Sequence, residues 1–341
     1  MIGTDEKALR WMLRAVEPYL MDPKTTDFAI NGPGEAWVKQ GGLYSRVETP
    51  YSLADLHDIA LYIAGYTRQE IGPRTPRCAS KLPHGHRVQL VQSPCVVPGT
   101  FSLSARKPSS FAPSLDRLDG MGQFRAVAER RPSRGLAARA ELAQLYLARD
   151  IKGFLAAAVR ARLTFLLVGR VGSGKTTLAT ALAREIPMTE RVVKIEDNDE
   201  IRLTQPNRVG LLYSKGGQGE AKVGPEDLME DTTRMDPSWV IAGEIRDAAA
   251  WTLFRTTTAD NPTITTCHGD GCEGGFEAVR LMVKTTEAGR TLSDHDIFRM
   301  LNRAVDVVIH CDRFEDDYSA AEIWYREVDA PLCLGRGDLV A

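Results

Sequence analysis

The sequence predicts an α/β protein of two domains, in which a small α+β domain precedes a domain built around a mostly parallel sheet. The chain has 341 residues, which is long for a single core. Its first part mixes helical and extended patterns, whereas its second half contains apolar runs that end in polar or glycine residues. We expect the N-terminal domain over residues 1–107, a linker over residues 108–149 and the C-terminal domain over residues 150–341.

Composition and charge narrow the class of protein. The formal net charge is −2 and the pI is about 6.3, so the chain has no overall attraction to nucleic acid. The six cysteines form no C-x-x-C pair, which favours reduced thiols in a cytosol over a zinc ribbon or a disulfide framework. There is no signal-peptide core, and no apolar run approaches the ~18 residues of a membrane span. We therefore expect a cytoplasmic protein that is at most peripheral to a membrane.

The N-terminal domain is expected to alternate helices with short strands. Apolar residues at helical spacing predict two helices, over residues 9–20 and 51–66. Ser52 and Asp55 form the pattern of a capping box at the start of the second helix. Four short extended runs bounded by turn signals predict strands over residues 27–31, 36–39, 87–91 and 100–105. Arg106 directly follows the last of these strands.

The predicted linker is rich in proline, serine, glycine and arginine. Its basic residues include Arg130, Arg131, Arg134 and Arg139. A basic run of this kind is usually a solvated face, but it is also suited to an anionic membrane surface. Both interpretations remain open from the sequence.

The C-terminal domain contains a pattern typical of phosphate binding. Residues 164–168 predict a buried strand, residues 178–186 predict a helix, and the segment between them matches G-x-x-x-x-G-K-[ST]. Glycines in such a loop let backbone N–H groups curl around an anion, and the helix directs its positive end at the same point. The predicted nucleotide-binding residues are Gly169, Gly172, Ser173, Gly174, Lys175, Thr176 and Thr177.

Two of these residues have expected individual roles. Lys175 should reach the β- and γ-phosphates, and Thr176 should offer its hydroxyl to a magnesium ion. We expect Lys175 to be a solvated loop cation before nucleotide binds. The predicted cofactors are therefore ATP and Mg²⁺.

Three further apolar strands are predicted to end in polar residues. They cover residues 191–195, 239–242 and 262–266. In an open parallel sheet the ligand lies beyond the carboxyl ends of the strands, so polar residues there should approach the γ-phosphate. A strand-end glutamate can instead be the neighbour of a helix cap, and a single histidine is often structural. The candidates are Glu196 after the first strand, Glu244 and Arg246 after the second, and His268 after the third.

The two glutamates are expected to divide two acidic tasks. An apolar strand that ends in an acid is typical of a Walker B element, whose carboxylate holds the magnesium shell or orients water. We favour Glu196 as the base that orients water and Glu244 as the residue in the magnesium shell. Spacing alone does not order two strand ends, so the reverse assignment stays open.

Four segments occur in the order typical of a known family. They are the phosphate loop at residues 169–177, the acidic box at 195–200, and the segments 243–247 and 265–268. Together they resemble those of the secretion-superfamily hexameric traffic ATPases. Residues 30–35, 82–89, 104–109 and 207–209 further resemble the branch that serves type IV secretion systems. The resemblance spans nearly the whole chain and is weakest in the linker and after about residue 325.

This resemblance implies a RecA-like P-loop NTPase domain and a ring-shaped homo-hexamer at the cytoplasmic face of the bacterial inner membrane. Such a ring would use ATP to drive substrate export or pilus assembly. Its implied partners are other secretion-system ATPases and inner-membrane channel components, and its substrate is an exported protein or DNA–protein complex.

The resemblance also implies roles for individual residues. In such rings nucleotide binds between the two domains, and arginines from the N-terminal side help to close the site, which makes Arg106 the candidate here. Glu196 matches the acidic-box glutamate, Glu244 the Walker B glutamate and His268 the histidine-box sensor.

The sequence departs from the family's usual pattern in three places. Val171 replaces a threonine of the phosphate loop. Residues 236–239 stand where an Arg-Pro-Asp-Arg-like stretch is common, and residues 259–262 replace a Gly-His-x-Gly-like turn. The last two departures flank the Walker B and histidine boxes, whereas the phosphate loop is intact.

Three other functions remain open from the sequence. Many type II secretion and type IV pilus motors carry a tetracysteine zinc motif, and its absence argues mildly against that role. A slowly hydrolysing, nucleotide-dependent assembly switch would tolerate the departures near Walker B. The acidic pI disfavours a nucleic-acid translocase.

Overall fold

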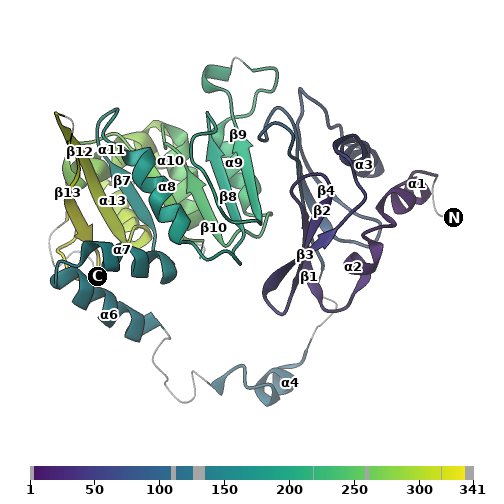
Figure 1. Ribbon diagram of the computed structural model, residues 1–341, viewed down its shortest axis with the longest axis horizontal. Helices are drawn as coiled ribbons and strands as arrows, with labels where there is room; N and C mark the ends of the chain where they lie inside the picture. The colour runs from purple at the N-terminus through teal and green to yellow at the C-terminus, as the bar shows by residue number, and fades with distance from the viewer. Residues whose placement is uncertain are drawn as a thin grey trace.

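The computed structural model describes residues 4–108, 113–125, 135–217, 219–257, 261–315 and 317–334. Two units lie side by side, each built around its own sheet (Figure 1). The N-terminal unit has a six-stranded sheet, and the C-terminal unit has a seven-stranded sheet. The predicted α/β fold class is confirmed.

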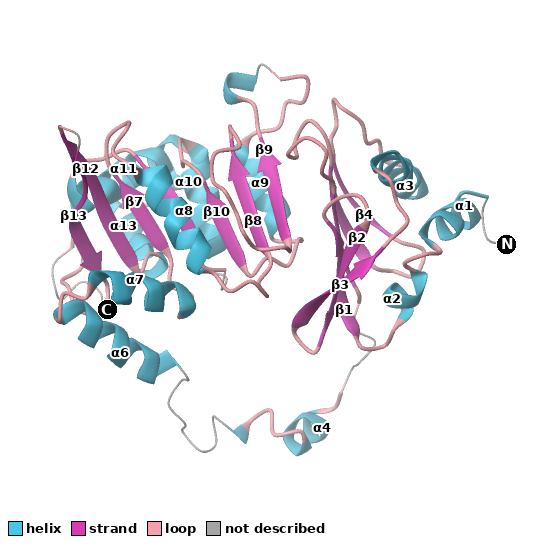
Figure 2. Cartoon of the chain, viewed as in Figure 1, coloured by secondary structure: helices cyan, strands magenta, loops and turns pink. Residues whose placement is uncertain are grey.

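The N-terminal domain is an antiparallel sheet with three helices on one face. Its strand order is β3-β2-β1-β6-β5-β4. The helices lie on the face turned away from the C-terminal domain (Figure 2). They are α1 (Thr4–Leu13), α2 (Glu17–Met21) and α3 (Leu53–Tyr66). The strands are β1 (Thr25–Ile30), β2 (Glu35–Gln40), β3 (Leu43–Glu48), β4 (Arg77–Lys81), β5 (Arg87–Val91) and β6 (Ser102–Arg106).

Side-chain alternation along the strands separates the helix-covered face from the opposite face. In β6, Leu103 and Ala105 belong to the apolar cluster under the helices, whereas Ser104 points to the other face. The predicted capping box is present, because the Ser52 hydroxyl accepts a hydrogen bond from the N–H of Asp55. The polar face of the sheet is thus free to meet the second domain.

The sequence pattern does not predict the two edge strands of this sheet. Every position of β3 is exposed or half-buried, and β4 buries only Cys78, so the alternation that marks a strand is weak in both. The helix predicted over residues 9–20 is also divided into α1 and α2. Pro18 lies at the start of α2, where its missing N–H prevents a continuous helix.

The C-terminal sheet has the order β13-β12-β7-β11-β10-β8-β9. The strands from β12 to β9 pair in parallel, and the edge strand β13 runs antiparallel to β12. The strands are β7 (Phe165–Val168), β8 (Val192–Glu196), β9 (Arg208–Leu212), β10 (Trp239–Ala242), β11 (Thr263–Cys267), β12 (Val307–Phe314) and β13 (Asp317–Tyr325).

Helices cover both faces of this sheet (Figure 2). In β7, Phe165 and Leu167 pack with α7 (Ile151–Arg160) and α8 (Lys175–Glu185). Leu166 of the same strand packs into the cluster on the other face. That face is covered by α9 (Pro225–Thr232), α10 (Ala248–Thr257), α11 (Gly271–Thr285), α12 (Glu287–Thr291) and α13 (Asp294–Ala304). Burial on both faces explains the continuous apolar character of β7.

The region predicted as a linker contains two helices in its described part, α4 (Leu115–Gly120) and α6 (Gly135–Leu147). Leu142 and Tyr146 of α6 are buried in the C-terminal core, and the Tyr146 ring meets Phe154 at a centroid distance of 5.1 Å. Residues 135–147 therefore pack as part of the C-terminal domain instead of spanning a gap.

Of the arginines in the predicted basic run, Arg139 pairs with Glu327 at 3.0 Å. Arg130, Arg131 and Arg134 of the predicted basic run lie outside the described residues.

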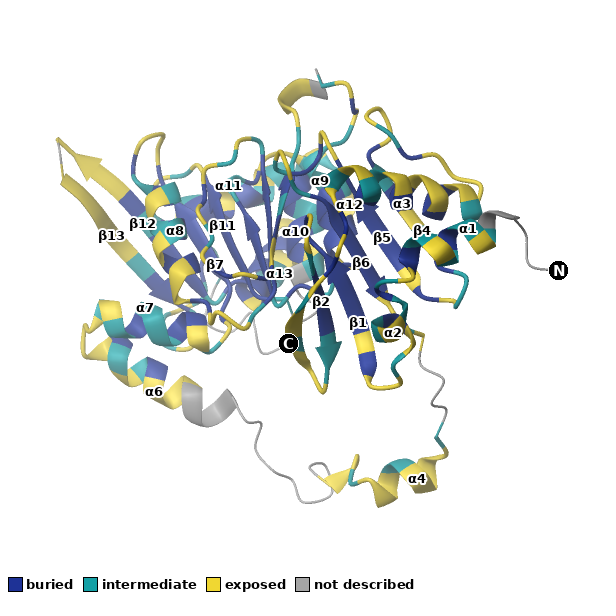
Figure 3. Cartoon of the chain, turned by 45° about the vertical axis from the view of Figure 1, so that its right-hand side comes forward, coloured by how far each residue is buried: buried dark blue, intermediate teal, exposed yellow. Residues whose placement is uncertain are grey.

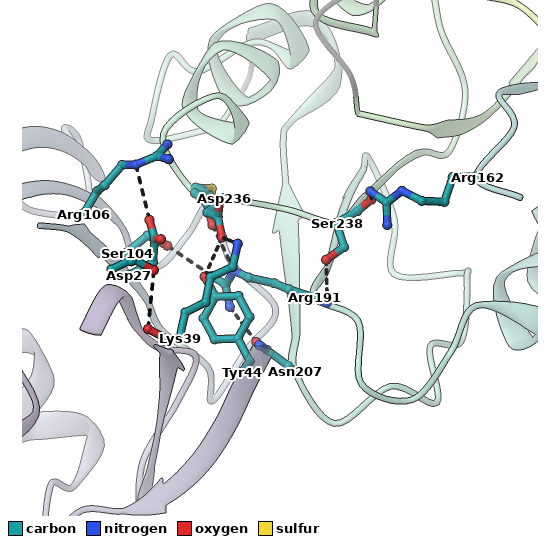
Figure 4. Close-up of polar contacts among 12 residues, drawn as sticks. Asp27, Lys39, Tyr44, Ser104, Arg106, Arg162, Arg191, Asn207, Asp236 and Ser238 are labelled. Carbon is teal, nitrogen blue, oxygen red and sulfur yellow. Dashed lines mark hydrogen bonds and ion pairs between the residues drawn. The ribbon is translucent and has the colours of Figure 1, made fainter. Parts of the chain in front are cut away.

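A buried arginine joins the two domains (Figure 4). Arg191 directly precedes β8, and its side chain is fully buried. Its Nη1 donates to Oδ1 of Asn31 at 2.9 Å and to Oδ1 of Asn207 at 2.6 Å. Its Nη2 donates to Oγ of Ser104 at 3.1 Å, and its Nε donates to the carbonyl oxygen of Met235 at 2.9 Å. Because Asn31 and Ser104 belong to the N-terminal domain, the guanidinium spans the interface.

Further polar contacts join the two domains. Lys39 Nζ and the Tyr44 hydroxyl both contact Oδ2 of Asp236, at 2.5 and 3.0 Å (Figure 4). Arg77 of β4 reaches Asp231 of α9, where its Nη2 donates to Oδ1 at 2.9 Å. Each contact joins a side chain of the N-terminal sheet to the C-terminal domain.

Main-chain hydrogen bonds extend the C-terminal sheet into the N-terminal domain. The N–H of Val97 donates to the carbonyl oxygen of Gly210 at 3.0 Å, and the N–H of Leu212 donates to that of Cys95 at 3.0 Å. Residues 95–97 therefore run along β9, the edge strand. They cover main-chain groups that an open edge would leave without partners.

These contacts place Arg191 and its partners at the amino ends of the parallel strands. Arg191, Asn207 and Ser238 directly precede β8, β9 and β10. The polar residues predicted to bind nucleotide follow the carboxyl ends of β7, β10 and β11 or end β8. The buried junction and the phosphate loop therefore lie at opposite ends of the same sheet.

We predict that Arg191→Lys lowers the free energy of unfolding by at least ~2 kcal/mol, because a lysine cannot reproduce the planar fork that binds four buried acceptors. The matched control is Arg162→Lys. Arg162 is 42% exposed and donates to the carbonyl oxygen of Ser238 in the same region. This control should change the free energy by no more than about 0.5 kcal/mol in urea unfolding. Equal losses in the two variants would contradict the role of Arg191.

Candidate nucleotide site

The phosphate loop joins β7 to α8 in a conformation that requires glycine. At Gly169 (φ +154°), a Cβ would lie 2.2 Å from the carbonyl oxygen of Cys311 and 2.6 Å from Oγ of Ser173. Gly174 has φ +84° and caps the N-terminus of α8. The N–H groups in the first turn of a helix have no helical partners, so this end of α8 is suited to bind phosphate.

Lys175 lies beneath this loop rather than in solvent. It is only 8% exposed, and its Nζ donates to the carbonyl oxygens of Gly169 at 2.8 Å and Arg170 at 2.7 Å. The expectation of a solvated loop cation is therefore wrong, because the loop's own carbonyl oxygens enclose the charge. Burial lowers the pKa of Lys175, and the nearby carboxylate of Glu244 opposes that shift.

The loop also contains a buried polar group without a partner. The hydroxyl of Ser173 is enclosed by the loop, and within the described part of the chain it forms no hydrogen bond. Burial of an unpaired hydroxyl is unfavourable, so such a group in a native structure points to a missing partner. A phosphate oxygen would supply one, and the loop therefore fits a phosphate group.

A pocket of about 860 Å³ opens at the phosphate loop, a volume typical of sites for small ligands. Its walls come from the loop and α8, from the carboxyl ends of β8, β10 and β11, and from the β12–β13 hairpin. The structure brings together most of the predicted site residues, because this pocket is lined by Gly172, Ser173, Gly174, Lys175, Thr176, Thr177, Glu196, Glu244, Arg246 and His268.

Glu244, Arg246 and His268 form a polar cluster beside the loop. Arg246 donates from Nε and Nη2 to the two carboxylate oxygens of Glu244, at 2.8 and 2.7 Å. Nε2 of His268 lies 2.9 Å from Oε1 of Glu244, and its Nδ1 lies 3.3 Å from the carbonyl oxygen of Gly169. Burial alone would raise the pKa of Glu244, but Arg246 and then His268 lower it below its ordinary value. This carboxylate is therefore held in its charged form.

Glu196 belongs to a second cluster that is more deeply buried. Its Oε2 accepts a hydrogen bond from Nζ of Lys194 at 2.6 Å, and its Oε1 accepts one from the N–H of Ile201 at 3.0 Å. Lys194 also contacts the carboxylate of Asp199. Burial raises the pKa of Glu196, and the hydrogen bond and charge of Lys194 oppose the rise. The two acids of the pocket thus have opposite pKa shifts.

The strand order separates these two acids. β11 lies next to β7, β10 lies next to β11, and β8 lies beyond β10. Glu244 follows β10 and contacts His268, whereas Glu196 ends β8, which lies one strand farther from β7. Glu244 is therefore the acid nearer to the phosphate loop. The division of roles between the two glutamates stays a prediction.

Arg106 does not line the pocket of its own chain. It ends β6, pairs with Asp27 at 3.5 Å and is 55% exposed. Figure 4 shows Arg106, Asp27 and Asp236 together at the domain interface, and Asp236 lies shortly before β10. Burial raises the pKa of Asp27, and the neighbouring charge of Asp236 adds to this rise. The residues that line the pocket all lie between Val171 and Ala320. Arg106 is therefore at the opposite end of the sheet from the phosphate loop.

Three residues in or next to the pocket are not predicted from the sequence to take part in the site. Lys194 is a charge inside an apolar strand, a signal that would have indicated a buried ion pair. Lys215 lines the pocket and pairs with Asp197. Tyr318 reaches the pocket from the β12–β13 hairpin. It lies after the last of the four family-like segments, which ends at residue 268, so no motif indicated it.

Comparisons with known proteins identify the family. Residues 131–318, more than half of the chain, match the family model described as Type II/IV secretion system protein. The chain belongs to this family. The match includes the whole phosphate loop and all the predicted strand-end residues, so the family signal and the pocket coincide.

Individual relatives are type IV secretion proteins. Protein VirB11 of Rhizobium radiobacter is 39% identical over 320 residues, which cover 93% of each chain. The type IV secretion system protein VirB11 of Bartonella henselae is 35% identical over 326 residues, covering 92% of this chain and 91% of the relative. A similar solved structure is the crystal structure of the VirB11 ATPase from the Brucella suis type IV secretion system in complex with sulphate. Its TM-score to this chain is 0.88 at 32% sequence identity, and the match covers 95% of this chain and 96% of the Brucella chain.

These comparisons confirm the resemblance, the two-domain fold with its RecA-like ATPase domain, and the enzyme class, an ATPase. They also favour type IV secretion over a type II secretion or pilus motor. Within the described residues, the structure has no helix that is both long and apolar enough to cross a membrane.

We predict that Glu196→Gln and Glu244→Gln impair different steps. If Glu196 orients water, its glutamine variant binds ATP but stalls, whereas Glu244→Gln also raises the Mg²⁺ concentration needed for turnover. The measurement is the rate of phosphate release as a function of Mg²⁺ concentration.

Glu196→Gln leaves the buried charge of Lys194 with less compensation, so loss of folding must be separated from loss of catalysis. The double variant Lys194→Met/Glu196→Gln removes that charge and serves as the control. A shifted Mg²⁺ requirement in Glu196→Gln but not in Glu244→Gln would reverse the two roles.

Proposed function

We propose that this protein is the ATP-hydrolysing motor of a type IV secretion system and that it works as a homo-hexameric ring. The observation that carries this proposal is the pocket, where the phosphate loop faces the polar cluster of Glu244, Arg246 and His268. Membership of the secretion family supports the proposal.

The phosphate loop is proposed to bind ATP by exchanging partners. Lys175 leaves the carbonyl oxygens of Gly169 and Arg170 and donates to β- and γ-phosphate oxygens instead. This exchange is favourable because hydrogen bonds between two charged groups are stronger than those to neutral carbonyls. The hydroxyl of Ser173 gains the acceptor that it lacks, and the N–H groups at the start of α8 complete the cradle.

The same pocket offers residues suited to magnesium. The hydroxyl of Thr176 and the carboxylate of Glu244 are oxygen donors, the ligand type that Mg²⁺ prefers. When bound, the ion would neutralise charge that develops on the transferred phosphoryl group. Arg246 holds Glu244 by a two-point hydrogen bond, and Glu196 is proposed to orient the attacking water.

Assembly is proposed to complete the site. Arg106 lies at the opposite end of the sheet from the phosphate loop of its own chain, and its side chain is half-exposed. In a ring, each subunit can present its exposed arginine to the pocket of the next one. An arginine finger of this kind typically contributes ~10³ to 10⁵ in rate.

The setting of this motor is also part of the proposal. We place the ring at the cytoplasmic face of the inner membrane, where it would act with other secretion-system ATPases and inner-membrane channel components on an exported protein or DNA–protein substrate. The named relatives support this setting because they are proteins of type IV secretion systems. The basic run between the domains is proposed to face anionic lipid.

We predict that Lys175→Ala abolishes ATP turnover, because it removes the charge that binds the transferred phosphoryl group. The control is Lys152→Ala, which changes an exposed lysine of α7 in the same domain. Phosphate release and thermal unfolding should be measured for both variants. If Lys175→Ala hydrolyses ATP within about threefold of the wild-type rate, a barrier change of under ~1 kcal/mol, the assignment of the loop fails.

We predict that Arg106→Ala lowers turnover far more than it lowers assembly, and that the specific activity of the wild type rises with protein concentration as rings form. The matched control is Arg46→Ala, since Arg46 is another half-exposed arginine of the N-terminal sheet with one carboxylate partner. Activity should be compared with the oligomeric state measured by light scattering. Activity that is independent of assembly and unchanged by Arg106→Ala would mean that one chain contains the complete site.

A further inference from the structure

The pocket continues past the phosphate loop on the side away from the acids. In the sheet, β12 and β13 lie on one side of β7, and β11, β10 and β8 lie on the other. Glu196, Glu244 and His268 line the end of the pocket beside β11, β10 and β8. The opposite end is formed by four residues of the β12–β13 hairpin: Cys311, Tyr318, Ser319 and Ala320.

These two ends set the direction in which a nucleotide lies. The γ-phosphate must face the acids, because they are the groups that orient water and hold the magnesium shell. The phosphate loop lies between the two ends and takes the β-phosphate. The ribose and base must therefore extend toward the hairpin.

Tyr318 offers a flat surface at that end. Its side chain is 61% exposed. Its Cδ1 lies 3.1 Å from the position that a Cβ on Gly174 would take, so the ring stands directly beside the start of α8. The guanidinium of Arg313, the cross-strand partner of Tyr318, lies 5.2 Å from the ring centroid. Aromatic rings and guanidinium planes are the groups on which nucleobases stack.

The neighbours of Tyr318 leave room for a ligand. Side chains alternate along a strand, so Ala320 lies on the same face as Tyr318, and its methyl group occupies little of that space. Ser319 also lines the pocket and is small. The hairpin therefore combines one large aromatic ring with two small residues, an arrangement that suits a flat base attached to a ribose.

We propose that Tyr318 is the platform on which the nucleobase of the bound nucleotide stacks. This inference rests on the proposed function, because it takes the pocket to be a nucleotide site. Stacking does not read the hydrogen-bonding edge of a base, so adenine and guanine nucleotides should use the same platform. Tyr318 contributes to affinity for the nucleoside part and leaves binding of the phosphates to the loop.

The test compares two probes, Mg²⁺-ADP and inorganic tripolyphosphate, by calorimetric titration of the full chain. Stacking on an aromatic side chain contributes ~1–3 kcal/mol per base, so Tyr318→Ala should raise the Kd for ADP by about 5- to 150-fold. The Kd for GDP should rise by a similar factor. Tyr318→Phe keeps the ring and should bind ADP within about threefold of the wild type. Phe314→Ala changes another exposed aromatic residue of the hairpin that does not line the pocket, and it should have no effect.

The outcomes separate this inference from the proposed function. Weaker ADP binding with unchanged tripolyphosphate binding in Tyr318→Ala supports the platform. An unchanged Kd for ADP in Tyr318→Ala overturns it, and so does an equal loss for both probes, which would mean that Tyr318 only supports the phosphate loop through Gly174. A wild-type chain that binds neither probe would contradict the nucleotide site itself.

Discussion

The buried guanidinium of Arg191 is the contact on which the arrangement of the two domains depends. A charged group inside a protein is stable only when its hydrogen bonds are satisfied, and two of the acceptors of Arg191, Asn31 and Ser104, belong to the other domain. Opening the interface would therefore break these two hydrogen bonds and separate the guanidinium from its partners in the N-terminal domain. Because Arg191 precedes β8, this junction fixes the N-terminal domain at the amino ends of the C-terminal strands. The carboxyl ends are left open for the ligand.

In the proposed ring, this geometry would let one chain supply groups to two different sites. The phosphate loop, Glu244 and His268 gather at the carboxyl ends of the sheet, where the loop carbonyl oxygens accept hydrogen bonds from Lys175. Arg106 lies at the other end, where its side chain pairs with Asp27 and is 55% exposed. The central strands of the C-terminal sheet are buried, whereas most of β13 is exposed (Figure 3). A ring closed by repeated head-to-tail contacts brings such complementary halves together at each interface. In the proposed ring, this polarity of the parallel sheet would make hydrolysis depend on assembly.

Much of the C-terminal fold can be predicted from local sequence, and the reason is physical. Strands such as β7 and β10 are buried on both faces, so they are continuous apolar runs, and the glycine pattern of the phosphate loop is set by local backbone geometry. Edge strands such as β3 carry no comparable pattern, because solvent on their exposed sides accepts polar residues. The burial of Lys175 depends on how the folded loop arranges its carbonyl oxygens, and the remote position of Arg106 depends on how the two domains pack, so the residue pattern reveals neither. Arg191 begins a strand as an ordinary charged residue, and only the packing of the second domain makes it a buried junction.

The most direct test of this account mixes subunits that carry Lys175→Ala with subunits that carry Arg106→Ala. Each variant alone should be nearly inactive in phosphate release. If Arg106 acts on the phosphate loop of a neighbouring subunit, a randomly mixed ring contains pockets with both groups intact, and an equal mixture should recover about a quarter of the wild-type rate. If both groups act within one chain, every pocket in the mixture lacks one of them. An equal mixture that stays as inactive as its components, although rings form, would contradict a site shared between subunits.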